Sequence, residues 1–202
     1  SMQFIVMPHS AMTELLAGGE TGSKLWEEVF ALTKDGRARI LETGMIACRS
    51  GEKALIESVR EEIFPIETQE IGAIGCGGSG RMWGDVDKQL PKHRSITAFQ
   101  IRNTGTLLEA EARVLEGERF VELRLVPELV TRLRLETMIE YSDKHGDASI
   151  RMPIFETWRT NTFLTLRAGR FRLVSVFSPK QQVPVPFLDS RVLLFVRADV
   201  LP

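Results

Sequence analysis

Residues 107–126 read LLEAEARVLEGERFVELRLV, and this stretch decides the fold class. Apolar residues alternate with charged ones on both sides of Glu116 and Gly117; they are Leu108, Ala110, Ala112, Val114, Val121, Leu123 and Leu125. Because successive side chains of a strand point to opposite faces, this alternation predicts strands with one buried face and one wet face. The sequence therefore predicts an antiparallel hairpin that turns at Glu116–Gly117.

The same alternation recurs along the rest of the chain. Further strands are predicted over residues 3–8, 38–47, 54–64, 133–141, 157–167, 171–177 and 192–200. Turn residues at 49–52 predict one long hairpin over residues 37–65, and Ala168–Gly169 predicts a turn between residues 157–167 and 171–177. We expect a mainly β (α+β) fold of long antiparallel hairpins, in a single domain over residues 1–202.

One segment departs from this period of two. Within residues 23–34 the apolar side chains recur every three or four residues, as they do along one side of a helix. We predict one principal helix near residues 23–34, with Trp26, Val29 and Phe30 packed on the sheet. A weaker helical turn is predicted around residues 12–16.

Residues 66–95 break both patterns, because six glycines and Pro91 crowd into them. We predict that Ile66–Ser95 is a long flexible loop or a gate-like segment, since such a chain buries too little side chain to offset its ordering entropy. Gly75–Gly80 matches the dinucleotide motif G-x-G-x-x-G in form, but no amphipathic helix follows it. We expect no cofactor at this segment.

Composition argues against several classes of function. Lys plus Arg total 26 and Asp plus Glu total 27, so no positive excess favours nucleic acid as a partner. The sequence holds no apolar run of about 18 residues or more, which a membrane-spanning helix would need. The first residues also lack the basic and then apolar pattern of a signal peptide.

The residues that could carry chemistry are dispersed. The possible nucleophiles, bases and ligands are His9, His93, His145, Cys48, Cys76, Asp85 and Asp87. Their spacing matches no nucleophile signature and no metal site. The two cysteines could form one disulfide or remain free thiols, and the acidic residues at 57–62 could form a solvated strand face, cross-strand pairs or a binding surface. We predict no catalytic residue, no metal and no cofactor, and therefore no enzyme.

Three blocks of the sequence resemble the bacterial secretin family of type II and type III secretion systems and type IV pili. The first block comprises LTKDGRARIL at 32–41, SGEKALIE at 50–57 and REEIFP at 60–65; the second spans 103–128; the third is PIFETWRTNTFLTLRAG at 153–169. Residues 192–196 resemble the closing strand of the family. The chain departs from the family pattern at residues 42–44 and at Ala112, where proline is common in the family.

The resemblance implies a subunit of a large ring, in which each copy lends strands to one closed sheet with a gate inside. Its partners would be other copies or other secretion-system proteins, in the outer membrane or periplasm. Residues 66–95 match the gate region of the family. Residues 178–190 lack the membrane-contacting lip, of which Val183–Phe187 is a remnant, so we expect a soluble chain that does not insert into lipid. The alternative is a soluble periplasmic partner-binding module without a pore.

Overall fold

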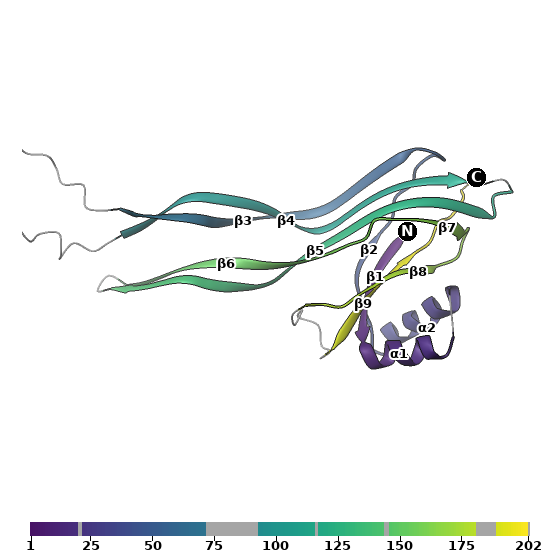
Figure 1. Ribbon diagram of the computed structural model, residues 1–202, viewed down its shortest axis with the longest axis horizontal. Helices are drawn as coiled ribbons and strands as arrows, with labels where there is room; N and C mark the ends of the chain where they lie inside the picture. The colour runs from purple at the N-terminus through teal and green to yellow at the C-terminus, as the bar shows by residue number, and fades with distance from the viewer. Residues whose placement is uncertain (20–21, 72–92, 116, 144–145, 181–188, 202) are drawn as a thin grey trace, which may run out of the picture. The chain divides into compact units, whose positions relative to one another are not determined.

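The computed structural model describes residues 1–19, 22–71, 93–115, 117–143, 146–180 and 189–201. Within them the chain forms two antiparallel sheets and two helices (Figure 1), so the predicted mainly β fold is confirmed. The chain divides into two compact units. We call residues 1–60, 103–133 and 155–202 the core unit, and residues 61–102 and 134–154 the hairpin unit.

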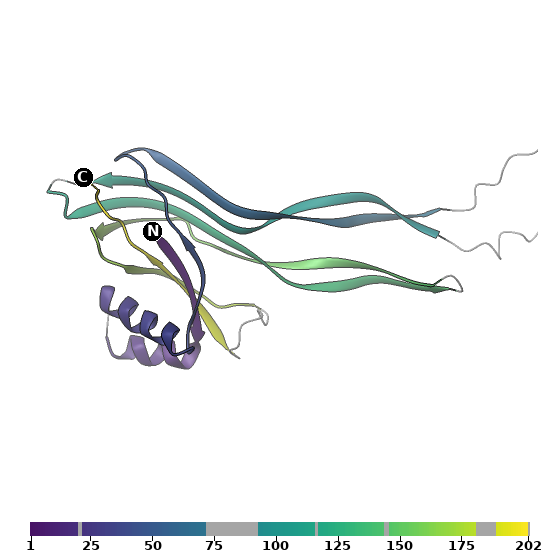
Figure 2. The same cartoon turned by 180° about the vertical axis from the view of Figure 1, so that it is seen from behind.

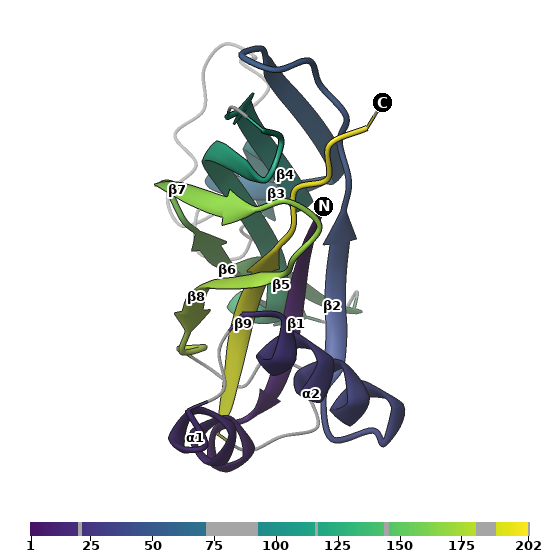
Figure 3. The same cartoon turned by 90° about the vertical axis from the view of Figure 1, so that its right-hand side faces the viewer.

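A four-stranded sheet forms the centre of the core unit. Its order is β2–β1–β9–β8, with β1 at Met2–Pro8, β2 at Arg39–Gly44, β8 at Arg172–Phe177 and β9 at Ser190–Val196. Strand β1 pairs with β9 in one unbroken antiparallel register, from Met2 opposite Val196 to Pro8 opposite Ser190. The first and last strands of the chain therefore lie side by side in the middle of this sheet (Figure 3).

Both faces of the β1–β9 pair are covered. Met2, Phe4 and Val6 point into one cluster of buried side chains, which is shared with strands of the second sheet. Ile5 and Met7 point into another cluster, which is shared with the two helices. Burial on both faces explains why β1 and β9 are almost continuously apolar instead of alternating with charged residues.

The two helices are α1, at His9–Ala17, and α2, at Ser23–Lys34. Both lie on the same face of the four-stranded sheet, as Figures 2 and 3 show. Helix α2 has the predicted bounds. The turn predicted around residues 12–16 is longer than expected, because Met12 and its neighbours extend it into a helix that contacts β1 and β9.

The buried face of α2 differs from the predicted one. Leu25, Val29 and Leu32 are buried against the sheet, so of the three predicted residues only Val29 lies in the centre of the face. Trp26 packs at the border of the buried cluster on the helix side of the sheet. The ring of Phe30 stacks on the ring of Trp26, with the two centroids 4.9 Å apart. Aliphatic side chains four and seven residues apart therefore form the contact, and the two rings line its flank.

The second sheet holds the long strands. They are β3 at Lys53–Ile71, β4 at His93–Val114, β5 at Phe120–Asp143, β6 at Gly146–Arg159 and β7 at Thr162–Arg167. Their order is β3–β4–β5–β6, and β7 also pairs with β5. The hairpin predicted across Glu116–Gly117 is confirmed, because β4 and β5 pair from Val114 opposite Val121 to Gly105 opposite Val130.

Two other predicted hairpins are wrong in their pairing. Residues 37–65 form no hairpin, because β2 pairs with β1 while β3 pairs with β4 in the other sheet. Residues 157–167 are two strands, not one, and β7 does not pair with β8, which pairs with β9. Both connections carry the chain from one sheet to the other. Alternation identifies a strand and its buried face, but it does not identify the partner strand.

The loop predicted at residues 66–95 is too long at both ends. Strand β3 runs to Ile71 and β4 begins at His93, so apolar residues such as Ile66 belong to the sheet. The glycine-rich centre, including Gly75–Gly80, lies outside the described residues.

Two neighbouring leucines test whether β9 is covered on both sides. Leu193 contributes to the cluster on the helix side and Leu194 to the cluster on the other side, and both are fully buried. Each change, Leu193→Ala and Leu194→Ala, should lower the free energy of unfolding by about 2–5 kcal/mol in chemical denaturation, because each leaves a cavity. Leu201→Ala, at a side chain that is 73% exposed, is the control. A near-neutral result for either core leucine would contradict the layered arrangement.

Candidate functional site

The hairpin unit contains little core of its own. Among its residues whose side chains are described, only Phe64 and Pro153 are buried. Its exposed large apolar side chains are Ile63, Ile66, Ile96, Phe99, Ile101, Leu135 and Met138. Ile63 is 65% exposed and Phe99 is 61% exposed, which is unusual for so many large apolar residues in one small unit. This concentration marks the surface as a candidate binding surface.

Strand β3 adds an open edge to this surface. It stands at one end of the sheet order, and in the described part of the chain its only strand neighbour is β4. A strand of 19 residues with a free edge offers a row of backbone donors and acceptors to a further strand. Of the acidic cluster that the sequence singled out, Glu57 and Glu61 are exposed, as a solvated strand face requires.

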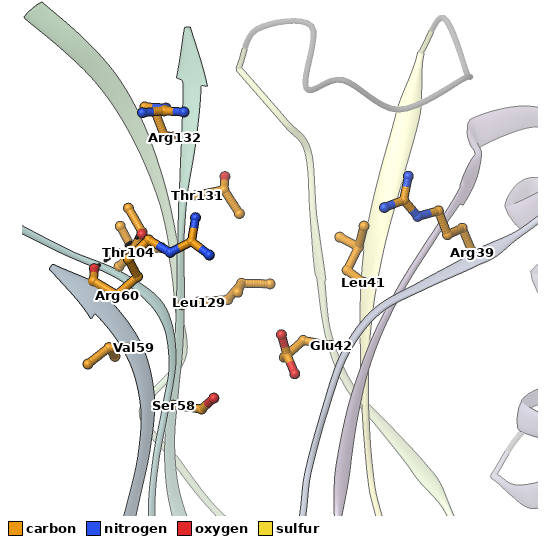
Figure 4. A pocket seen from close by; sticks show the side chains of 12 residues that line it. Arg39, Leu41, Glu42, Ser58, Val59, Arg60, Thr104, Leu129, Thr131 and Arg132 are labelled. Atoms are coloured by element: carbon orange, nitrogen blue, oxygen red, sulfur yellow. Dashed lines mark hydrogen bonds between the residues drawn. The ribbon is translucent and has the colours of Figure 1, made fainter. Parts of the chain in front are cut away.

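A groove of about 560 Å³ lies in the core unit beside strand β2. Figure 4 shows its two walls, with Glu42 on one side and Arg60 and Leu129 on the other, all pointing into the space between them. Arg39 and Arg132 also line the groove. It therefore offers guanidinium groups, hydroxyl groups and one carboxylate, which suit polar binding more than acid–base catalysis.

One wall of the groove depends on a glycine. Gly105 of β4 has a φ angle of +121°, and a Cβ atom built on it would lie 2.2 Å from the carbonyl oxygen of Ser58 in β3. The hydroxyl of the neighbouring Thr104 donates a hydrogen bond of 3.3 Å to the carbonyl oxygen of Arg60. The two backbones are thus closer at this point than any residue with a Cβ allows.

Of the dispersed reactive residues, only His9 and Cys48 have described side chains, and these two are not part of a common site. His9 begins α1, where its backbone N–H donates to the carbonyl oxygen of Asp189, and Cys48 is exposed. Neither lines the groove. Cys76, Asp85, Asp87 and His145 lie outside the described residues, and His93 is placed only as part of strand β4. Across the described residues, no three His, Cys, Asp or Glu side chains are grouped as a metal site would need.

Sequence reasoning did not identify the exposed apolar surface of the hairpin unit or the groove. Arg39, Arg60 and Arg132 come from three strands of two sheets, so no spacing along the chain could have joined them. The sequence does carry a signal for the exposed apolar surface. Ile63, Ile66 and Phe99 lie on strands that have apolar side chains on both faces.

No family model, curated protein or solved structure matches this chain. Within the described residues, no helix has both the length and the apolar character that crossing a membrane would require.

The close approach at Gly105 gives a stability test with a matched control. Gly105→Ala should destabilise the chain by about 2 kcal/mol or more, because the new methyl group meets backbone atoms as well as an unfavourable φ angle. Gly117→Ala is the control, since Gly117 has a φ angle of +77° but no atom near its Cβ position, and only about 1 kcal/mol should be lost. Urea denaturation of the two variants measures the difference. Equal losses would show that the strand contact at Gly105 is not as close as described.

Proposed function

We propose that this chain is a secretin-like subunit that assembles through its long strands into a channel for protein secretion or pilus passage across an outer membrane. The observation that carries the proposal is the hairpin unit, which exposes seven large apolar side chains on strands and buries few. The order of the three sequence blocks that resemble secretins supports the same function.

Energetics favour another copy of the strands as the cover for this surface. Isolated two-stranded hairpins are marginally stable in water, and further strands are normally needed to bury an apolar face. Burying one exposed side chain such as Phe99 or Ile101 contributes about 1.5–3 kcal/mol. Joining strands between copies would also pair the free edge of β3, which otherwise invites uncontrolled association.

The charges on the two end strands favour a head-to-tail arrangement. Strand β3 carries five acidic and two basic residues, whereas β6 and β7 together carry three basic and two acidic ones. Strand β6 alone carries two residues of each sign, so the positive excess comes from Arg167 of β7. Pairing β3 of one copy with β6 and β7 of the next would therefore set the acidic strand against strands with a small positive excess, whereas pairing β3 with β3 would oppose like charges. Head-to-tail contacts of this kind close into rings when the rotation between copies allows it.

The second candidate function is a soluble periplasmic module that binds a partner protein without forming a pore. The missing lip in residues 178–190 favours it, because this segment lacks the contiguous apolar band that contact with lipid needs. Liposome flotation with and without detergent separates the two functions. A large assembly that floats with liposomes supports the channel, and an assembly or small species that stays with the soluble fraction supports the module.

Two glutamates on the hairpin unit should block self-association. Phe99→Glu with Ile101→Glu places charges at side chains that are 61% and 57% exposed, so the fold of one copy is spared while burial between copies becomes costly. Light scattering after size exclusion should show a mass that rises with concentration for the unaltered chain and a monomer for the variant.

The control for this experiment is Met45→Glu with Leu201→Glu, which adds the same charge at exposed apolar residues outside the hairpin unit. It should associate like the unaltered chain. If the unaltered chain stays monomeric at all concentrations, or if the hairpin variant associates equally well, assembly through this surface is wrong.

A further inference from the structure

A second hollow of the core unit is lined by basic side chains. It encloses about 540 Å³, and its charged lining residues are Lys24, Arg167, Arg170 and Arg172. Two aromatic rings, those of Phe120 and Phe171, complete much of the wall. Of the described residues that line it, none is an aspartate or a glutamate.

Four like charges around one hollow repel one another. A carboxylate beside the turn, that of Asp199, accepts a hydrogen bond of 2.7 Å from the guanidinium of Arg197, which does not line the hollow. The nearest acidic position along the paired strands is Glu122, which lies opposite Thr165 in β7 and also opposite Arg113 in β4. The guanidinium of Arg172 donates a hydrogen bond of 3.1 Å to a neutral acceptor, the carbonyl oxygen of Thr165. An anion in the hollow would relieve this repulsion.

A rigid turn holds three of the cations in place. Residues 167–172 connect β7 to β8, and backbone hydrogen bonds tie this turn to two other segments. Ala168 N–H donates to the carbonyl oxygen of Arg119 at 2.9 Å, and Gly169 N–H donates to that of Ala198 at 2.8 Å. Arg170 N–H closes the turn on Arg167 at 3.3 Å. The arginines therefore stand on a fixed backbone, which lowers the entropy cost of binding a ligand.

The aromatic wall is also fixed by its neighbours. The ring of Phe171 stacks on Trp26 with the ring centroids 4.2 Å apart, and the guanidinium of Arg197 lies 5.7 Å from the centroid of the Phe171 ring. Phe120, opposite Arg167 on the paired strand, is 47% exposed. A ligand can thus place an anionic group among the arginines and an apolar part against the rings.

We propose that this hollow binds a phosphate-bearing ligand. Guanidinium groups match the oxygens of phosphate in pairs of parallel hydrogen bonds, and a phosphate carries more charge and more acceptor oxygens than a carboxylate. Three arginines and a lysine suit a phosphate or pyrophosphate group better than a single carboxylate. The volume exceeds that of one phosphate, so the ligand is either a soluble phosphate compound or a phospholipid headgroup. This inference does not depend on the proposed function.

The test is titration calorimetry of the full chain with pyrophosphate. Arg167→Gln with Arg170→Gln removes two guanidinium groups from exposed side chains, and the Kd for pyrophosphate should rise by about tenfold or more. Arg37→Gln with Arg49→Gln is the control, because it removes equal charge from exposed residues that line neither the hollow nor the groove beside β2. Thermal unfolding of each variant without ligand checks that the fold is kept.

Vesicles distinguish the two sources of phosphate. Co-sedimentation with phosphatidylglycerol vesicles that pyrophosphate reverses, and that the paired arginine change abolishes, assigns the hollow to a headgroup. Saturable pyrophosphate binding without co-sedimentation assigns it to a soluble phosphate compound. The absence of saturable pyrophosphate binding, or equal affinity in the paired variant and the unaltered chain, overturns the proposal.

Discussion

Strands β1 and β9 bury the side chains of both their faces, and this requirement sets the layers of the core unit. Phe4 and Leu194 need cover on one side, while Ile5 and Phe195 need it on the other. The parts of the long strands that belong to the core unit cover the side of Phe4 and Leu194, and the two helices cover the side of Ile5 and Phe195. Because β1 precedes the long strands in the sequence and β9 follows them, the pairing of β1 with β9 joins segments that are far apart along the chain.

The hairpin unit obeys a different constraint. Its strands are continuous with strands of the core unit, but few of their side chains in the hairpin unit are buried. Phe99 and Leu135 remain exposed, whereas Leu108 and Leu125, on the same two strands, are buried in the core unit. A chain that extends apolar strands beyond its core needs other strands to cover them, and this need supports the proposed assembly.

Periodicity predicted the helix α2 and the β4–β5 hairpin correctly, because each is a local pattern with a local turn. It joined the end of β6 to β7 as one strand, and it assigned the end of β3 and the start of β4 to a loop. It failed where the partner strand is distant, as for β2, which joins β1 across α1 and α2. The helical period predicts Trp26 and Phe30 on the packed face beside Val29, whereas Leu25 and Leu32 occupy that face with Val29. The groove beside β2 could not have been predicted, since Arg39, Arg60 and Arg132 converge only through the tertiary fold. The second hollow did leave a local signal, because three of its cations lie within residues 167–172, but its other wall comes from distant segments.

Hydrogen exchange of the chain, read strand by strand, tests the central claim most directly. In dilute solution the amides of residues 61–68, 96–102 and 134–140 should exchange at least about a hundredfold faster than those of β1 and β9, because local opening there exposes little new apolar surface. At concentrations where the chain associates, the same amides should become protected. Equal protection of both units in a dilute, monomeric sample would contradict the account, because the hairpin unit would then be stable without a partner.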